Sequence, residues 1–426
     1  MTAHPTPPGA LRHRDFRLLW LAGSASVVGD AIVTVALALF VIDRTGSATD
    51  LGLVMAGYSL PLVGFLLIGG VWADRLPRHR LMVATDLVRF ALHGLLAALI
   101  LTGEVRIWQI VVIEMLFGSA EAFFRPAATA LLPQTVPEDD IQQANALVST
   151  SNNVAEFAGP ALAAALVVWA GAGAAFAVDA GTFLLSAAFL WGIHPRDRGE
   201  HRAAERRPVL EELREGYREV RSRDWVWATL VSISVSLFVA LAPWYVLGPV
   251  LADQQYGDTA VYGLMAASFG AGTVAGSLLG IRWEPEHPMR LGILMLLPWP
   301  PAMALFAAGV SLPLAAAGLA VAGAGIALFE VWWLTALAER IPPERLSRVT
   351  SYDWMVSLGL LPLGYLLVGP LSEAFGAVEV FLAGCALALV ATLAALLPRD
   401  TWNLRRAEGE PPQVPVTQTP PGVPLP

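Results

Sequence analysis

The sequence predicts an all-helical integral membrane protein with twelve transmembrane helices in two pseudo-symmetric bundles of six. Of the 426 residues, 56% are hydrophobic and only 15% are charged, whereas a soluble domain carries roughly 25% charged residues. Apolar runs long enough to cross a hydrocarbon core of about 30 Å, which takes about 20 residues, recur along the whole chain. A charged segment divides these runs into six and six.

The expected spans follow from where charges, Pro and Gly clusters interrupt the apolar runs. In the first half they cover 16–42, 50–73, 80–102, 106–130, 141–168 and 171–193. In the second half they cover 225–251, 257–281, 289–309, 312–338, 347–371 and 375–397. The sequence therefore divides into an N-terminal tail at 1–15, a bundle at 16–193, a linker at 194–224, a bundle at 225–397 and a C-terminal tail at 398–426. The last sixteen residues contain seven Pro, so this tail is predicted to be disordered.

The arginine distribution predicts the orientation. All 27 basic residues are Arg, and 23 of them fall in the tails and the even-numbered connections, against Arg44 and Arg106 in the odd-numbered ones. Because cytoplasmic loops carry the excess of positive charge, both termini are expected in the cytoplasm of a bacterium, with the chain in its inner membrane. The linker holds nine Arg, and its apolar positions favour a helix lying on the membrane surface over a regulatory or lipid-recognition site.

Several classes of function are disfavoured by composition. The net charge of −8 and the scattered Arg residues argue against a nucleic-acid partner. Without any Lys, the phosphate-binding loop of an ATPase cannot operate. The single Cys385 and the scattered His residues form no metal-ligand pattern, and no catalytic set or cofactor motif is found. A secondary transporter driven by an ion gradient remains.

The two halves share a short internal sequence repeat at an offset of 205 residues. Val136 and Pro137 align with Ile341 and Pro342, in the loop that enters the fifth span of each half. Repeats of the same orientation are typical of two bundles related by an axis along the membrane normal, with a substrate cavity between them near the midplane.

The connection after the second span, GGVWADRLPRHRL, resembles the signature of the major facilitator superfamily. Trp72, Pro77 and His79 depart from that signature, and its conserved positions are filled by Gly70, Ala73, Asp74, Arg75 and Arg78. The resemblance implies a cytoplasmic gate in which these charged residues lock one conformation. The alternative, that the Arg residues only set topology, leaves Asp74 and Gly70 unexplained.

The fifth span, ANALVSTSNNVAEFAGPALAA, is similar to the antiporter signature of exporters in this superfamily. Gly159 and Pro160 are retained, while alanines replace the other glycines. In the fourth span Glu114 stands where the drug-exporter signature has Arg, four residues before Gly118. Further stretches resemble the enterobactin-exporter and macrolide or tetracycline efflux branch, over residues 10 to 400, which implies export of a small molecule.

Acidic residues within the spans are the candidates for proton coupling. A charged side chain at the bilayer centre costs about 2.5–3.5 kcal/mol on insertion scales. Asp30 lies near the middle of the first span with no basic residue nearby, and hydrocarbon favours the neutral form of a carboxylic acid. It is therefore a candidate proton carrier; the alternative is a structural hydrogen bond to a neighbouring helix.

The fourth span carries one polar stripe, formed by Glu114, Gly118, Glu121 and Arg125. Glu121 and Arg125 form an i, i+4 pair that we interpret as structural or gating. Glu114 has no partner on its own helix and is a second candidate for proton or cation binding. Asp86 and Arg89 on the third span are assigned, with this pair, to the cytoplasmic gate.

The fifth span and the second half supply candidates for a cavity wall. Asn152, Asn153 and Glu156 lie on one face before the Gly159–Pro160 break, and Glu156 is the third proton-coupling candidate. Three deep aromatic residues could line an apolar cavity, although simple helix packing is the alternative: Phe269, Phe329 and Trp333.

Together these features predict a proton-coupled exporter of a small hydrophobic or cationic molecule, such as a drug, siderophore or metabolite, working by alternating access. Its expected partners are the cargo, protons and the lipid bilayer, without cofactor or metal, and a monomer is the expectation from the resemblance. An importer or facilitator of the same fold is the first alternative. A non-transporting sensor or scaffold is the second, and the acids within the membrane count against it.

Overall fold

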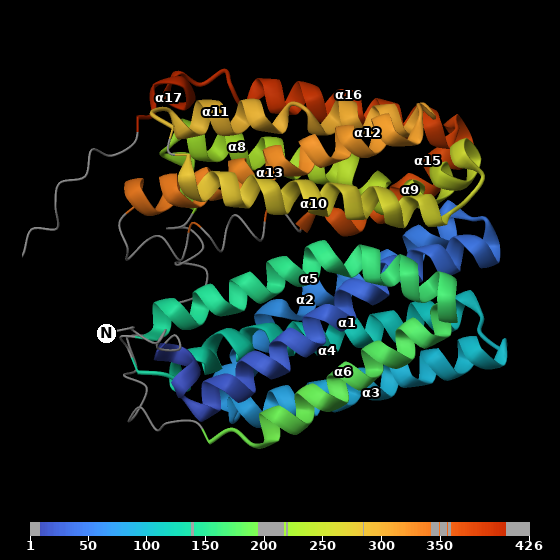
Figure 1. Cartoon of the computed structure of the whole chain (residues 1–426), viewed down its shortest axis with the longest axis vertical. Coiled ribbons are helices and arrows are strands. Elements are labelled where there is room, and N and C mark those ends of the chain that lie inside the picture. Colours follow the sequence, from blue (N-terminus) through green and yellow to red (C-terminus); the bar gives the residue numbers. More distant parts are fainter. Residues whose placement is uncertain are drawn as a thin grey trace, which may run out of the picture.

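The computed structural model describes residues 9–137, 140–194, 217–218, 220–283, 285–341, 349, 356 and 359–405. These residues form helices and no strand. Figure 1 shows the helices as two bundles lying side by side, with α1–α6 in one and α8–α17 in the other. The predicted fold class of a helical membrane protein is therefore confirmed.

The N-terminal bundle consists of η1 (Gly9–Arg12), α1 (Arg14–Thr45), α2 (Ala48–Arg75), α3 (Arg78–Thr102), α4 (Ile107–Leu131), η2 (Leu132–Gln134), α5 (Ile141–Ala170) and α6 (Ala172–Trp191). The C-terminal bundle begins with α8 (Asp224–Ser236), η4 (Leu237–Leu241), α9 (Ala242–Tyr256), α10 (Ala260–Arg282), α11 (Pro288–Leu296) and α12 (Trp299–Ala307). It ends with α13 (Leu312–Arg340), α15 (Leu361–Phe375), α16 (Ala377–Ala394) and α17 (Arg399–Asn403).

Within the described residues, 10 helical stretches are long and apolar enough to cross a membrane. They coincide with ten of the twelve predicted spans. The remaining predictions, 141–168 and 347–371, correspond to the shorter apolar pieces Ala158–Ala170 and Leu361–Phe375. The count of twelve therefore stays a prediction, while a multi-pass membrane protein is established.

The structure refines several predicted boundaries. The seventh span runs to Tyr256 and contains a π-helical turn, η4. The ninth is divided between α11 and α12, because the nearby Pro298 and Pro300 cannot donate helical hydrogen bonds. The C-terminal tail opens with α17, in which Thr401 is buried. Most of the predicted surface helix of the linker, and the proline-rich end, lie outside the described residues. The last part of the linker is described, and its Val220 is buried in the C-terminal bundle.

Glycine residues set the closest helix pairs in both bundles. A Cβ at Gly118 of α4 would lie 2.1 Å from the carbonyl oxygen of Tyr58 in α2, so these backbones are in direct contact. In the C-terminal bundle, a Cβ at Gly323 of α13 would lie 2.1 Å from the carbonyl oxygen of Phe269 in α10. The two glycines are 205 residues apart, which is the offset of the sequence repeat. Small residues allow this close approach in membrane helices.

The bundles touch each other at the ends that carry the odd-numbered connections. There α2 packs against α15 and α5 against α10. A Cβ at Gly369 would lie 2.4 Å from the Cα of Thr49, and the Thr49 hydroxyl donates to Glu373 Oε1 at 2.5 Å. One hydrophobic cluster, which includes Leu39, Leu51, Leu247 and Tyr365, spans both bundles at this end.

At the opposite ends, the two bundles have separate hydrophobic clusters. One is confined to the N-terminal bundle around Phe16, Met82 and Phe124. The other is confined to the C-terminal bundle around Trp225 and Trp333. Among the described residues, the cores are thus joined at the odd-numbered connections and divided at the even-numbered ones.

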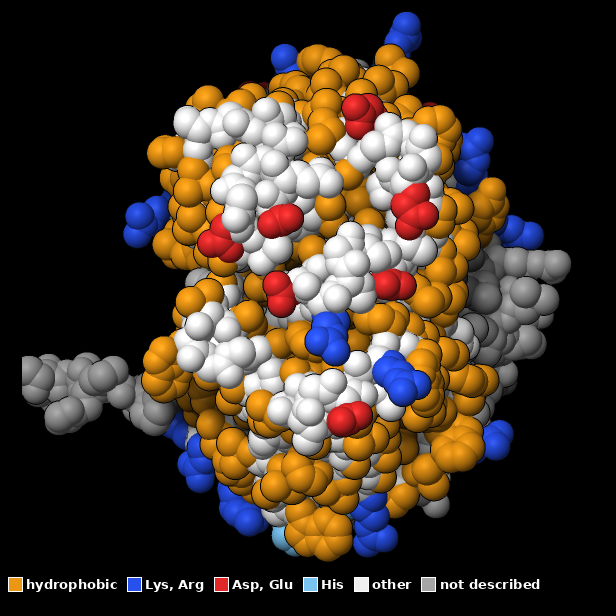
Figure 2. All heavy atoms as spheres, turned by 90° about the vertical axis from the view of Figure 1, so that its right-hand side faces the viewer, with side chains coloured by type: hydrophobic (Ala, Val, Ile, Leu, Met, Phe, Trp, Pro, Cys, Tyr) orange, Lys and Arg blue, Asp and Glu red, His pale blue; other side chains and the backbone are white. Residues whose placement is uncertain are grey.

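Figure 2 views the joined end and shows acidic side chains gathered there within a hydrophobic rim. The exposed acids of the odd-numbered connections and the adjoining helix ends are Asp43, Glu104, Asp253, Asp258, Glu373 and Glu379. Few basic residues accompany them, as the arginine distribution requires. The scarcity of arginine at the joined end is what the predicted orientation expects, since there this end faces away from the cytoplasm.

The close contact between α2 and α4 predicts that Gly118→Ala destabilises the N-terminal bundle by about 1–3 kcal/mol, since the added methyl meets backbone. Gly64→Ala is the matched control, because a Cβ at Gly64 of α2 would meet no atom within 4 Å. The measurement is the midpoint of thermal unfolding of the purified chain in detergent. Equal midpoints for the two variants would contradict the packing described here.

The orientation can be checked with two matched cysteines in a Cys385→Ala background. Glu104→Cys lies between α3 and α4, and Glu286→Cys lies between α10 and α11; both positions are exposed. We expect a membrane-impermeant maleimide to label Glu104→Cys in intact cells and Glu286→Cys only in opened cells. The reverse pattern would invert the topology.

Candidate functional site

The fully buried charged side chains of the described residues all lie in the N-terminal bundle. They are Asp86, Arg89, His93, Glu114, Glu121 and Asp179. They come from α3, α4 and α6, while Asp30 of α1 is half-buried beside them. In the C-terminal bundle, the buried polar residues of the described part are serines and threonines. The site is therefore an asymmetric feature of a pseudo-symmetric fold.

Arg89 organises the first half of this network. Its Nη1 donates to Glu121 Oε2 at 2.6 Å, and its Nη2 donates to Asp86 Oδ1. The Ser186 hydroxyl donates to the second oxygen of Asp86 at 2.6 Å, and Arg125 Nε donates to Glu121 Oε1 at 2.7 Å. Charge-assisted hydrogen bonds of this kind are what makes ionised groups tolerable away from water.

Aromatic rings enclose the same guanidinium. Its central carbon lies 4.0 Å from the ring centroid of Phe124 and 4.5 Å from that of Phe183. A cation over an aromatic face gains energy from the ring quadrupole, and the gain is larger where water is excluded. Arg89 is 1% exposed, so these rings replace part of its lost hydration.

His93 organises the second half, close to the middle of α3. Its Nδ1 makes a hydrogen bond with Asp179 Oδ2 of α6, and its Nε2 lies 3.6 Å from Glu114 Oε1 of α4. The imidazole stacks on the ring of Phe117, with centroids 3.9 Å apart and an angle of 5° between the planes. An imidazole is thus held between carboxylates from two different helices.

Asp30 adjoins this group where α1 meets two other helices. A Cβ at Gly29 would lie 2.2 Å from Asp179 Oδ1, and one at Gly159 of α5 would lie 2.3 Å from the Cβ of Ala31. Asp30 interacts electrostatically with Glu121, Asp179, Arg89 and His93. The predicted proton-coupling residues Asp30 and Glu114 thus belong to one neighbourhood.

The charges of this neighbourhood do not balance. Five carboxyl groups (Asp30, Asp86, Glu114, Glu121 and Asp179) share two guanidinium groups and one imidazole. Even with a protonated imidazole, two carboxyl groups are left without a positive counterpart. An uncompensated carboxylate inside a bilayer is unfavourable, because hydrocarbon favours the neutral form of a carboxylic acid.

The structure separates the predicted gate residues into two groups. Asp86, Arg89, Glu121 and Arg125 form the network described above. Gly70 and Arg75 lie in the last turns of α2, and Arg78 begins α3, where its Nη1 donates to the carbonyl oxygen of Ala130 at 2.8 Å. The Asp74 side chain lies outside the described residues.

The predicted antiporter-like pair lies where α5 packs between α1 of its own bundle and α10 of the other. Gly159 faces α1, and the carbonyl oxygen of Pro160 is 3.8 Å from a Cβ placed at Gly263 of α10. On the same helix, Asn152 is exposed, whereas the side chains of Asn153 and Glu156 lie outside the described residues. The third proton-coupling prediction, Glu156, is therefore placed by its backbone alone.

The predicted aromatic residues of the second half do not meet at one place. Phe329 and Trp333 are buried and stacked, with centroids 6.0 Å apart, in the cluster at the even-numbered ends. Phe269 packs against the cluster that joins the bundles. For Phe329 and Trp333 the structure therefore gives helix packing, the alternative considered from the sequence.

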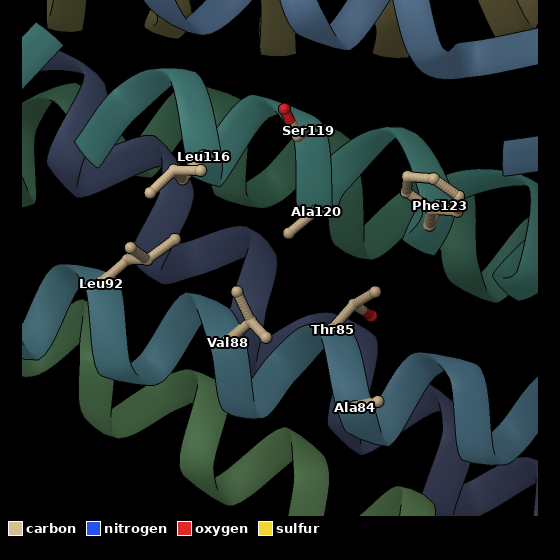
Figure 3. Close-up of a pocket in the computed structure, with 8 residues that line it drawn as sticks. All are labelled: Ala84, Thr85, Val88, Leu92, Leu116, Ser119, Ala120 and Phe123. Atoms are coloured by element: carbon tan, nitrogen blue, oxygen red, sulfur yellow. The ribbon is translucent and has the colours of Figure 1, made fainter. Parts of the chain in front are cut away.

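One pocket, of about 330 Å³, lies between α3 and α4. Figure 3 shows its lining of mostly apolar side chains from the two helices. Its two hydroxyls, on Thr85 and Ser119, donate to carbonyl oxygens of their own helices. Val88 and Leu116 are about half exposed, so the pocket opens to the outside of the bundle and contains none of the predicted cavity residues.

Sequence reasoning missed the participation of His93 and Asp179 in one site. A signal was present, because Asp86, Arg89 and His93 are spaced 3 and 4 residues apart on one face of α3. A basic residue in that register marks a helix face that points into a bundle. The contact between His93 and Asp179 of α6 could not be read from the sequence. Asp179 lies against Gly29 of α1, and the sequence does not show that α1 and α6 are adjacent.

Comparison with known proteins gives consistent results along most of the chain. The family model described as Major Facilitator Superfamily matches residues 19–357. The chain is 23% identical over 382 residues to macrolide efflux protein A of Streptococcus pyogenes, covering 86% of this chain and 91% of that protein. It is 25% identical over 397 residues to multidrug efflux pump Tap of Mycolicibacterium fortuitum, covering 90% and 95%.

Solved structures share the fold at low sequence identity. A bacterial homologue of the human lysosomal transporter Spinster, in an inward-facing and unoccupied conformation, superposes with a TM-score of 0.67 at 16% identity, covering 92% of this chain and 95% of that one. The nucleoside transporter NupG gives a TM-score of 0.65 at 11% identity, covering 92% and 99%.

The network predicts unequal roles for its two arginines. Arg89→Gln leaves Asp86 and Glu121 buried without their shared cation, and we expect a destabilisation of about 3–5 kcal/mol. Arg125→Gln, the matched control, removes a side chain that is 49% exposed, so we expect less than about 1 kcal/mol. Thermal unfolding midpoints in detergent check both, and a larger loss for Arg125→Gln would be incompatible with Arg89 as the centre.

Proposed function

Because the chain belongs to the Major Facilitator Superfamily, we propose that it is a proton-coupled exporter of a small hydrophobic or cationic molecule. Its relatives include proteins named for macrolide efflux and multidrug efflux, which supports drug-like cargo in preference to the siderophore or metabolite alternatives. The proposed location is the inner membrane of a bacterium, with both termini in the cytoplasm. The proposed functional unit is a monomer, because a single chain carries both bundles.

The observation that carries this proposal is the excess of carboxyl groups in the N-terminal bundle. Two acids without a positive counterpart can each be neutralised by a proton, and Asp30 lies where α1, α5 and α6 meet. A proton bound there from outside and released to the cytoplasm would drive export. The membrane potential assists, since moving one charge through 100 mV contributes about 2.3 kcal/mol.

The packing of the bundles supports alternating access as the transport mechanism. Among the residues that the structure describes, their cores are joined at the odd-numbered connections and divided at the even-numbered ones. With the predicted orientation, this arrangement corresponds to a conformation that is closed outside and open to the cytoplasm, in which an exporter collects its cargo. Export then requires the joined end to separate while the divided ends come together.

The cargo is proposed to be mainly apolar, because the C-terminal bundle offers few charges within its described residues. Its buried polar groups are hydroxyls, and several already donate to carbonyl oxygens of their own helix, as Thr229 and Ser234 do. A surface of this kind favours apolar molecules, with hydroxyl groups available for a small number of hydrogen bonds.

The test is export from cells that lack their own pumps. We expect expression of the chain to lower accumulation of a macrolide and of a cationic dye, and a protonophore to abolish the difference. Asp30→Asn, an amide that binds no proton, should reduce export to background while the protein still inserts. Asp253→Asn, at an exposed position near the end of α9, is the matched control and should export normally.

Three outcomes would count against the proposal in different ways. Export that persists with protonophore, or in Asp30→Asn, would remove the proton coupling through this residue. Accumulation that rises on expression would indicate an importer. Unchanged accumulation of both probes would exclude them as cargo, and proton release from the lumen of inverted vesicles upon addition of further candidate molecules would then identify the solute.

A further inference from the structure

We infer that His93 and Glu114 form a proton-sharing pair, in which one transported proton passes between the imidazole Nε2 and the Glu114 carboxylate while Asp179 positions the ring. This inference rests on the proposed proton coupling and assigns part of it to named atoms. His93 then acts within the coupling site itself, beyond the carboxylates that the sequence singles out.

The first argument is the pair of unsatisfied atoms. Nε2 of His93 and Oε1 of Glu114 are both buried without a hydrogen-bond partner, and they face each other at 3.6 Å. Buried polar atoms normally have partners, because an unpaired one costs about 1–3 kcal/mol. An approach of a few tenths of an ångström would close a hydrogen bond in which a single proton lies between the two atoms.

The second argument is the position of the other ring nitrogen. Asp179 is hydrogen-bonded to Nδ1 and lies on a different helix from Glu114. We assign Asp179 as the ionised partner of the imidazole; such a carboxylate has no hydrogen to donate, so Nδ1 carries the proton of that hydrogen bond. Nε2 is then left either as a lone pair or as an N–H, and only the Glu114 side of the ring changes when a proton arrives.

The step is a simple exchange. A protonated Glu114 donates to the lone pair of Nε2, giving an ionised carboxylate and an imidazolium; the reverse transfer returns the proton to Glu114. No other bond forms or breaks. In the first state both groups are neutral, and in the second they are an ion pair, so the exchange changes the charge distribution but not the total charge of the site.

The surroundings suit a group that must titrate without being solvated. The rings of Phe117, Phe176 and Phe183 contact the imidazole. The titratable groups that interact with it are Glu114 of α4, Asp179 of α6 and Asp30 of α1. Asp86 and Arg89 lie on its own helix, Arg89 binds Glu121 of α4, and Tyr58 of α2 packs on Phe117 behind the imidazole. Of these, Glu114 and Asp179 face the two ring nitrogens.

The position of the proton in this pair is also linked to the packing of α6 against α1. The second oxygen of Asp179, Oδ1, is buried without a hydrogen-bond partner and lies against Gly29 of α1. An imidazolium holds the Asp179 carboxylate more strongly than a neutral imidazole does. The proton position is therefore linked to the contact between α6 and α1, next to Asp30.

The test uses the full purified chain in lipid nanodiscs and does not need a cargo. Infrared difference spectra between acid and alkaline pH report the C=O band of protonated carboxylic acids, and ¹⁵N-histidine NMR reports the protonation of each ring nitrogen. We expect Glu114→Gln to lose one carboxylic-acid band and to shift the titration of His93 Nε2 by about one pH unit or more, as interacting sites do.

The reciprocal change should appear in His93→Gln, in which the pH at which the Glu114 carboxylic-acid band appears is expected to shift by about one unit or more. Glu104→Gln and His194→Gln, at exposed positions, are the matched controls and should leave both signals in place. Asp179→Asn should change the Nδ1 signal of His93, because the ring loses the partner that fixes its tautomer.

Independent titrations of His93 and Glu114, or a Nε2 signal that is constant across the pH range, would overturn the inference. A purely structural His93 would give that result even where the variants lose stability. If the substituted chains do not fold, the same spectra of the wild-type protein provide the test. A shared proton requires the imidazole and carboxylic-acid signals to change over the same pH interval. Absence of proton-coupled export of every candidate molecule would refute the proposed function and leave this result standing.

Discussion

The N-terminal bundle depends on one constraint, which is that a guanidinium removed from water must be surrounded by carboxylates. Arg89 meets Asp86 and Glu121, and these acids in turn engage Ser186 and Arg125. Contacts from α3, α4 and α6 therefore converge on one cation. Without it, two carboxylates would remain in an apolar interior, and the helices that bring them together would have no electrostatic reason to do so.

Backbone contact complements this polar centre. Gly118 against Tyr58 and Gly323 against Phe269 bring helix pairs together without intervening side chains. Because main chain meets main chain there, each pair resists deformation and can move as a unit. The two bundles share only one hydrophobic cluster among the described residues, at the odd-numbered connections. Stiff bundles that are joined at one end are better suited to a rocking motion of whole bundles than to local bending of single helices.

Much of this architecture was predictable from the sequence, because membrane insertion imposes a strong and simple pattern. Apolar length placed most spans to within a few residues, and the fourth-span stripe correctly paired Glu121 with Arg125. Contacts between helices were harder to predict from the sequence. The sequence showed that Glu114 had no partner on its own helix, but it could not show that His93 of α3 lies 3.6 Å away. Such distances depend on how helices rotate and tilt, which hydrophobicity does not specify.

The π-helical turn at Leu237–Leu241 has a consequence for the aromatic residues that follow it. A π turn holds one residue more than an α turn, so everything beyond it is rotated by about 100° relative to an uninterrupted helix. That rotation determines which way Trp244 points, and its ring lies 5.2 Å from that of Tyr262 and 5.5 Å from that of Phe306. One additional residue in the chain thus decides whether a bulky indole stabilises the protein interior or is presented to lipid.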